Sequence, residues 1–321
     1  MNVATFQVRV AARHSVATDI TTFELVDLDG RTLPPFSAGS HIDVHVTDQL
    51  VRQYSLCNDP SENHRYLIGV LRDANSRGGS AAMHERVKVG DLVRISAPKN
   101  HFPLANGAAR SLLMAGGIGI TPILCMAERL SASGAAFDMH YCTRSRERTA
   151  FRDRINGSSF ASKVQFHFDD GDVAQRLDLV ATLADPQPGV HLYVCGPKGF
   201  IDATLAAARS AGWQPQQLHF EFFSAEVSPS ESDESFEVKL ASSGRIVVVA
   251  KDQTVIQALA FAGVDIPTSC EQGVCGTCLT RVIEGVPDHK DLFMTPEEQA
   301  LNDQFTPCCS RAKTPQLVLD I

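Results

Sequence analysis

Four cysteines in the last third of the chain have the residue type and spacing needed to hold iron. Cys270, Cys275 and Cys278 stand as C-x4-C-x2-C within SCEQGVCGTC, and 29 residues separate Cys278 from Cys308. This spacing supplies four thiolates to the two irons of a 2Fe–2S cluster, and the metal itself lowers the pKa of the thiols. The sequence therefore predicts a one-electron redox centre with these four ligands.

The loop that carries the first three cysteines also contains Gly273 and Gly276. Glycines let the loop wrap closely and turn backbone N–H groups toward the sulfurs. The alternatives are a zinc site or inert buried thiols, but zinc sites favour short, paired C-x2-C knuckles. Cys308 is followed directly by Cys309; spacing favours Cys308 as the ligand and leaves Cys309 as a small buried hydrophobe.

A second redox group is indicated by RQYSLCN, residues 52–58. On a strand, Arg52 and Tyr54 face one side and Ser55 faces the other. A flavin needs aromatic or apolar packing on its ring, a polar contact near N5, and cations or N–H groups for its phosphate. These three residues offer each kind of group, although many exposed strands carry such a pattern without a ligand.

A glycine-rich turn in NSRGGSAAMHE supports the flavin interpretation. Gly78, Gly79 and Ser80 precede a helical stretch, so backbone N–H groups can converge on a phosphate at the start of a helix. The alternative is a plain turn without a ligand.

AGGIGITP, residues 115–122, follows an apolar strand and precedes a helical pattern, an order that can hold a pyrophosphate. Gly116, Gly117 and Gly119 permit close approach of the backbone. Thr121 is expected to cap the helix, and Pro122 fits its first turn. The spacing differs from G-x-G-x-x-G, so this is a related solution; a tight turn without a ligand is the alternative.

The segment YVCGPKGF, residues 193–200, repeats the order strand, glycine turn, helix, with Cys195, Gly196 and Pro197 at the turn. On chemistry alone, Cys195 is either a positioning residue or a buried core thiol. Hydride transfer between a nicotinamide and flavin N5 needs no protein nucleophile, so we assign Cys195 to positioning.

Three polar residues follow the strand pattern MHYC, where the adenosine end of a nucleotide would lie. They are Thr143, Arg144 and Arg146. An arginine here would meet the 2′-phosphate of NADPH and favour it over NADH.

The periodicity of the apolar residues divides the chain into segments, and these segments must position the candidate residues. Residues 1–104 alternate in period two, which predicts an antiparallel barrel or sandwich. Residues 105–225 alternate apolar runs with helical patterns, which predicts a parallel α/β sheet. Residues 226–235 are rich in Ser, Pro and acidic residues and are expected to be a linker. Residues 236–321 carry strand patterns, an amphipathic helix and the cysteine loop.

Composition limits the kinds of partner. The net charge of −8 lies entirely in residues 226–321, which hold 15 acidic and 7 basic residues and argue against nucleic acid. An acidic C-terminal third fits either docking on a basic surface or ordinary solubility. No apolar run approaches the roughly 20 residues needed to span a membrane, and no signal peptide is recognised, so a cytoplasmic protein is expected.

Together, SCEQGVCGTC and PCCSRA resemble the ferredoxin domain of the phthalate dioxygenase reductase family, which includes vanillate demethylase reductases. The similarity covers the whole chain. It implies three modules: an antiparallel flavin-binding β-barrel, a parallel α/β nicotinamide-binding domain, and a C-terminal β-grasp domain with a plant-type 2Fe–2S cluster.

The resemblance also implies roles for individual residues. Arg52, Tyr54 and Ser55 would contact the flavin, Gly79 and Ser80 would contact its phosphate, and the GGS form favours FMN over FAD. Cys195 would lie by the nicotinamide, with Gly196 and Pro197 shaping the pocket. Phe223, with Phe222 as the alternative, would stack on the flavin; two core phenylalanines are the other interpretation. The CTR stretch at Thr143 and Arg144 favours NADH.

The resemblance further implies a monomeric reductase that delivers electrons to a terminal Rieske-type oxygenase. Two other functions remain open from the residues. One is an electron carrier with a degenerate flavin or nicotinamide site, against which the intact motifs argue. The other is a stand-alone FAD-containing reductase that serves a different acceptor.

Overall fold

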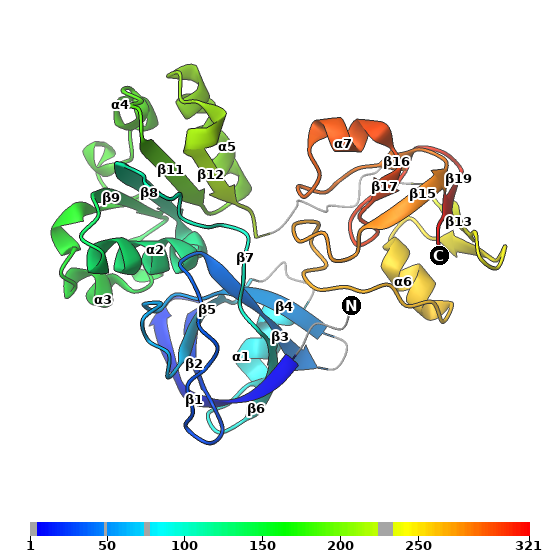
Figure 1. Cartoon of the computed structure of the whole chain (residues 1–321), viewed down its shortest axis with the longest axis horizontal. Helices are drawn as coiled ribbons and strands as arrows, with labels where there is room; N and C mark the ends of the chain where they lie inside the picture. The colour runs from blue at the N-terminus through cyan, green and yellow to red at the C-terminus, as the bar shows by residue number, and fades with distance from the viewer. Residues whose placement is uncertain (1–4, 48–49, 74–77, 224–233) are drawn as a thin grey trace. The chain divides into compact units, whose positions relative to one another are not determined.

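The N-terminal strands close into a barrel. In the computed structural model, which describes residues 5–47, 50–73, 78–223 and 234–321, they form one sheet in the order β4-β3-β6-β1-β2-β5, with β7 added to β3 (Figure 1). Leu56, directly after β4, forms an antiparallel bridge with Ile68 in β5, so the two ends of the sheet meet. Closure removes the free edges, and the barrel is therefore favoured over a sandwich.

Alternation along these strands places apolar side chains inside the barrel, among them Val8, Phe23, Ile42 and Ile68. The elements are β1 (Thr5–Ala17), β2 (Ile20–Val26), β3 (Ser40–Thr47), β4 (Leu50–Ser55), β5 (Tyr66–Leu71), α1 (Gly79–Arg86), β6 (Leu92–Ser96) and β7 (Lys99–Asn100).

The following segment forms the predicted parallel α/β sheet, in the order β10-β9-β8-β11-β12. In Figure 1, α2 and α3 lie on one side of this sheet and α4 and α5 on the other. The carboxyl ends of parallel strands share one edge, where ligands bind in such sheets. The elements are β8 (Arg110–Gly116), α2 (Ile120–Ala132), β9 (Phe137–Thr143), α3 (Arg152–Asn156), β10 (Val164–Phe168), α4 (Leu179–Leu183), β11 (Val190–Cys195), α5 (Lys198–Ser210) and β12 (Leu218–Glu221), with short 3-10 turns η1 (Gly117–Gly119), η2 (Arg146–Arg148), η3 (Ala161–Lys163), η4 (Val173–Gln175) and η5 (Pro215–Gln217).

The C-terminal segment has a mixed sheet, β14-β13-β19-β15-β17, and a small β16–β18 pair. β13 and β19 are parallel, and helix α6 packs Val255, Ala258 and Leu259 into the same core. Thr254 begins α6 through a capping box with Gln257. The elements are β13 (Phe236–Leu240), β14 (Ile246–Val249), α6 (Val255–Phe261), β15 (Thr280–Glu284), β16 (Pro287–Asp288), α7 (Pro296–Leu301), β17 (Gln304–Phe305), β18 (Arg311–Ala312) and β19 (Gln316–Leu319).

The chain separates into two compact units, 1–221 and 222–321, so the barrel and the α/β sheet share one unit. The finer division into residues 1–104, 105–225 and 236–321 is kept as a proposal. The predicted linker, 226–235, lies outside the described residues except for its last two. Across the described ranges, none of the helices has the length and apolar character needed to cross a membrane.

A histidine pair links strands β9 and β10, and its protonation state follows from geometry. His140 Nδ1 lies 3.0 Å from His167 Nε2, and His167 Nδ1 lies 2.8 Å from the Gln175 carbonyl oxygen. Because a carbonyl only accepts, His167 donates from Nδ1 and accepts at Nε2, which makes His140 the donor in the pair. Burial, followed by the neighbouring His167, lowers the pKa of His140 to about 4.

This pair predicts acid sensitivity. The folded protein keeps His140 neutral, whereas the unfolded chain protonates it near pH 6.5. The free energy of unfolding should therefore fall as the pH drops from about 6.5 to about 4, by up to about 3 kcal/mol from this residue. His140→Asn, which retains a donor, should lose this part of the pH dependence in urea denaturation. The exposed His64→Asn should keep the wild-type pH dependence; an unaltered profile in His140→Asn would contradict the assignment.

Candidate cofactor sites

Strand β4 presents the predicted flavin residues to its two faces. Tyr54 packs against the barrel core, and Arg52, on the same face, is buried. Ser55 is also buried, and its side chain forms a hydrogen bond with Glu221 at the end of β12. The last residue of the flavin strand therefore reaches the ligand-binding edge of the α/β sheet.

The two flavin motifs meet in space. A Cβ on Gly79 would lie 2.5 Å from Arg52 Nε and 2.7 Å from Arg52 Cγ, so only glycine leaves room for the buried arginine. Gly79 is the first residue of α1, and Gly78 before it has a φ of +84°, a conformation that favours glycine. A guanidinium and the amino end of a helix thus lie together, and both attract an anion such as a phosphate.

Ser80 lies in the first turn of α1. Its hydroxyl oxygen accepts a hydrogen bond of 3.2 Å from the Asp73 backbone N–H. This contact ties the phosphate turn to the segment that follows β5. Of the predicted phosphate residues, Gly79 lies directly against Arg52, and Gly78 and Ser80 are its neighbours in the chain.

The two nicotinamide turns are packed backbone against backbone. A Cβ on Gly119 would lie 2.3 Å from the Cys195 carbonyl oxygen, and one on Gly196 would lie 2.9 Å from Gly116 Cα. A Cβ on Gly116 would lie 3.0 Å from Pro197 Cδ. Since real Cβ atoms do not approach so closely, these glycines are required for the ends of β8 and β11 to meet. The turns predicted separately from sequence form one surface.

Gly117 and Thr121 differ in role from those glycines. Gly117 has a φ of +52° and open space where a Cβ would be. Glycine is therefore favoured there by the backbone conformation and not by lack of space. The expectation that Thr121 caps the helix was wrong: α2 begins at Ile120 with Gly119 at the cap position, after the 3-10 turn η1. The Thr121 hydroxyl instead donates to the Ile118 carbonyl, 3.1 Å away. Pro122 does lie in the first turn, as predicted.

Cys195 and Glu221 place two uncharged groups beside Ser55. Burial raises the pKa of the Cys195 thiol, and the nearby Glu221 raises it further. Burial also raises the pKa of Glu221 to about 8, against the hydrogen bond from Ser55. Glu221 Oε2 is buried without a hydrogen-bond partner among the described residues. A neutral thiol fits positioning rather than nucleophilic attack, and Glu221 holds a proton at neutral pH.

Glu221 was missed by sequence reasoning. It stands in HFEFFSAE, one residue before the aromatic pair Phe222 and Phe223. The available signal was its position at the carboxyl end of a parallel strand, where functional residues gather.

The residues predicted to lie near the adenosine of the nucleotide differ in their exposure to solvent. Thr143 is buried, and its hydroxyl lies 2.8 Å from Thr149 Oγ1 and 3.1 Å from the Ser145 carbonyl oxygen. Thr143 therefore holds the loop after β9 in shape. Arg144 and Arg146 are exposed at the same edge of the sheet and remain the candidates for contact with a nucleotide.

The four predicted cluster cysteines form two neighbouring pairs. The Cys270 and Cys275 thiols share a hydrogen bond, which lowers the pKa of Cys275 to about 5, and Cys308 is hydrogen-bonded to Cys278. The Gln272 backbone N–H lies 3.3 Å from Cys270 Sγ, so the loop does point N–H groups at sulfur. Two pairs of thiols match the two irons of a 2Fe–2S cluster, each with two protein ligands.

Cys309 occupies a different environment from Cys308. Its sulfur lies 3.2 Å from Thr306 Oγ1, and a Cβ on Gly273 would lie 2.5 Å from it. Gly273 and Gly276 have φ values of +71° and +69°, which favour glycine. The geometry favours Cys308 as the fourth ligand and explains why Gly273 has no side chain.

Phe223 follows β12, is half-buried and belongs to the second compact unit. Its stacking on a flavin stays a prediction.

Comparisons with known proteins show the family of the chain. Residues 238–313 match the family model of the 2Fe-2S iron-sulfur cluster binding domain, and residues 96–218 match that of the N-terminal domain of dimethylamine monooxygenase subunit DmmA-like proteins. The chain is 56% identical over 313 residues to a vanillate O-demethylase oxidoreductase of Pseudomonas putida, covering 97% of this chain and 98% of the relative. It is 39% identical to a phthalate dioxygenase reductase of Burkholderia cepacia, covering 98% and 97%.

Among solved structures, a phthalate dioxygenase reductase matches with a TM-score of 0.84 and 38% identity, covering 99% of this chain and 98% of that one. It is described as a modular structure for electron transfer from pyridine nucleotides to a 2Fe-2S centre.

The fold and the sites define an electron-transfer flavoprotein reductase with a 2Fe–2S domain. The chain belongs to the phthalate dioxygenase reductase family, which confirms the resemblance carried by its motifs.

Replacement of Gly79 should weaken flavin binding. In Gly79→Ala the new methyl group must displace the buried Arg52 side chain, so we expect at least about tenfold weaker FMN binding, or about 1.4 kcal/mol. Flavin fluorescence quenching on titration of apoprotein measures the affinity. Gly90→Ala, at a φ of +96° with open space around it, controls for backbone strain alone. Equal affinities in the two variants would contradict the steric account.

The assignment of the fourth ligand is directly testable. Cys308→Ser should lose the visible absorption and the reduced-state electron paramagnetic resonance signal of the cluster, whereas Cys309→Ser should retain both. The reason is that Cys308 is hydrogen-bonded to Cys278, whereas Cys309 is hydrogen-bonded to Cys308, Thr306 and Ser310. The reverse pattern would make Cys309 the ligand.

Proposed function

We propose that this chain takes hydride from NADH onto FMN and passes electrons singly through its 2Fe–2S cluster to a terminal Rieske-type oxygenase. The observation that carries the proposal is the meeting of three strand ends. Ser55 closes the flavin strand β4, its side chain is hydrogen-bonded to Glu221 at the end of β12, and Glu221 influences Cys195 at the end of β11. Hydride transfer requires this juxtaposition of flavin and nicotinamide residues.

The residues present fit both organic cofactors. Arg52, Tyr54 and Ser55 would hold the flavin and its phosphate together with Gly79 and Ser80, in a cradle that a Cβ on Gly79 would fill. The joined glycine turns and the exposed Arg144 would hold the nucleotide. When bound, a flavin accepts two electrons together and releases them one at a time, which the cluster requires.

The chain itself supplies position and a low-polarity environment. The buried Cys195 and Glu221 keep their protons at neutral pH, so neither side chain would place a charge beside the transferred hydride. Glu221 retains an unpartnered buried oxygen that can serve a polar atom of a bound cofactor. Both features favour transfer between cofactors over reaction with the protein.

The relatives are reductase components of oxygenase and demethylase systems, so the acceptor is an oxygenase. Three of them, at 48 to 56% identity, are vanillate O-demethylase oxidoreductases. We therefore propose a vanillate-type demethylase as the first oxygenase to test. Residues 226–321, with 15 acidic and 7 basic residues, favour a basic docking surface on that partner. A monomeric, cytoplasmic reductase is part of the proposal.

Anaerobic absorption spectroscopy tests the route. NADH should bleach both the flavin and the cluster absorption, with NADPH at least about tenfold less effective. Chromatography of the released flavin should give FMN; FAD would instead favour the stand-alone reductase. A spectrum that NADH does not change would refute the hydride-transfer function.

The order of electron flow makes a second prediction. Cys275→Ser should remove the cluster and abolish reduction of a one-electron acceptor such as cytochrome c, while anaerobic flavin reduction by NADH stays within about twofold of wild type. The physical reason is that Ser55, Cys195 and Glu221 belong to the first compact unit, whereas Cys275 belongs to the second. Cys309→Ser, which leaves the four predicted ligands in place, is the control. Loss of flavin reduction in a folded Cys275→Ser protein would contradict this order.

A further inference from the structure

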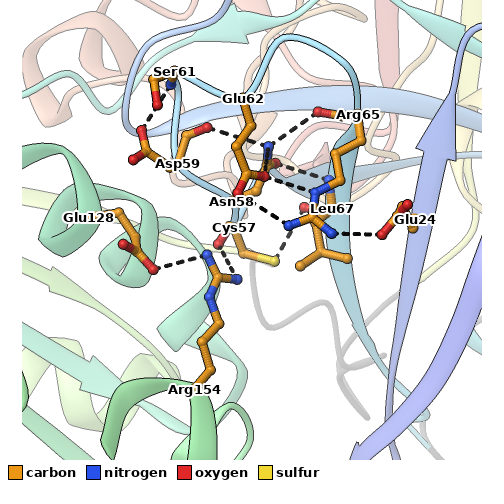
Figure 2. Close-up of polar contacts among 10 residues, drawn as sticks. All are labelled: Glu24, Cys57, Asn58, Asp59, Ser61, Glu62, Arg65, Leu67, Glu128 and Arg154. Carbon is orange, nitrogen blue, oxygen red and sulfur yellow. Dashed lines mark hydrogen bonds and ion pairs between the residues drawn. The ribbon is translucent and has the colours of Figure 1, made fainter. Parts of the chain in front are cut away.

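The loop that follows the flavin strand is held from two sides by arginines. Figure 2 shows this loop, from Cys57 to Leu67, with Arg65 on the barrel side and Arg154 from α3 on the other. Arg65 bonds Glu62 within the loop at 2.8 Å and Glu24 on β2 at 2.7 Å. Arg65 therefore fastens the loop to the barrel itself.

Within the loop, the fully buried Asn58 acts as an internal brace. Its amide nitrogen donates to Glu62 and to the Arg65 carbonyl, and its oxygen accepts from the Leu67 N–H at 3.0 Å. The Cys57 thiol donates to the Leu67 carbonyl at 3.2 Å. The loop is thus held by its own hydrogen bonds from Cys57 to Leu67, and Ser55 lies only two residues before Cys57.

Arg154 connects this rigid loop to the nicotinamide-binding sheet. Its Nη1 donates to the Cys57 carbonyl oxygen and its Nη2 to Glu128 Oε1 on α2, each at 3.0 Å (Figure 2). Burial raises the pKa of Glu128, and the Arg154 guanidinium opposes that rise. One planar guanidinium therefore joins the loop after the flavin strand to α2 and α3. Lysine cannot reproduce this geometry.

The same interface is tightly packed nearby. A Cβ on Gly69 in β5 would lie 2.9 Å from Thr121 Cγ2 and 3.3 Å from Phe151 Cζ. Thr121 belongs to the first turn of α2, directly after the nicotinamide turn, and Phe151 directly precedes α3. The barrel thus touches both helices that Arg154 joins, and Arg154 supplies the directional polar contact at this packed surface.

We propose that Arg154 is a positioning residue for hydride transfer: it sets the place of Ser55 relative to the nicotinamide turns through the Cys57 carbonyl and Glu128. Arg154 lies outside both cofactor motifs, and its role rests on the proposed hydride-transfer function. Because hydride transfer is sensitive to displacements of about 1 Å, loss of this contact should slow the transfer roughly ten- to a hundredfold.

The test is single-turnover flavin reduction by NADH in Arg154→Met, Arg154→Lys and Glu128→Gln. The limiting reduction rate should fall at least about tenfold in Arg154→Met and less in Glu128→Gln, which keeps an acceptor, while the NADH dissociation constant and flavin content change less than about twofold. With 4-deuterated NADH the primary isotope effect on that rate should increase. Amide hydrogen exchange should rise across residues 56–67, a readout that does not depend on activity.

Arg152→Met, two residues away on the same helix, is the matched control and should behave as wild type. A wild-type reduction rate in Arg154→Met, or a fall in rate fully explained by lost flavin or weaker NADH binding, would overturn the proposal. If Arg154→Met does not fold, Arg154→Lys and Glu128→Gln decide: wild-type rates in both would refute it. If NADH fails to reduce the wild-type flavin, the proposed function is refuted. Hydrogen exchange still tests whether Arg154 holds the loop of residues 57–67.

Discussion

The structure depends on a place where two stretches of backbone lie closer together than any side chain would allow. The turn after β8 and the turn after β11 touch at Gly116, Gly119 and Gly196. That contact aligns the neighbouring strand ends and sets where α2 begins. Because α2 also packs on the barrel through Thr121, one helix connects this contact to the barrel within the first compact unit.

Around this contact the protein keeps its chemistry uncharged. Cys195 and Glu221 are neutral at the pH of the cell because burial penalises their ionised forms. Two positive charges belong to the flavin half: Arg52 lies against Gly79 at the predicted phosphate turn, and Arg154 donates a hydrogen bond to the Cys57 carbonyl oxygen. In the proposed arrangement, the cofactor phosphates would meet cations, whereas the hydride would pass between the neutral side chains of Cys195 and Glu221.

Local patterns predicted most of the fold and the 2Fe–2S domain, since each reflects the geometry of a few adjacent residues. The cysteine spacing, the glycine turns and the period-two strands are of this kind. Thr121 was assigned a wrong role because a 3-10 turn shifts the start of the helix, which composition does not reveal. The contacts of Glu221 with Ser55 and of Arg154 with Cys57 could not be predicted, because each joins residues far apart in sequence that only the tertiary fold brings near.

Arg144 and Arg146 contrast with the glycines. Both are exposed beyond the end of β9, whereas the turns that align the reacting groups are constrained at the backbone. If Arg144 and Arg146 contact the nucleotide as proposed, replacing them would change the coenzyme preference without disturbing the backbone contact between the turns. Coenzyme preference would then be free to evolve in this architecture, while the glycine turns could not change without separating the ends of β8 and β11.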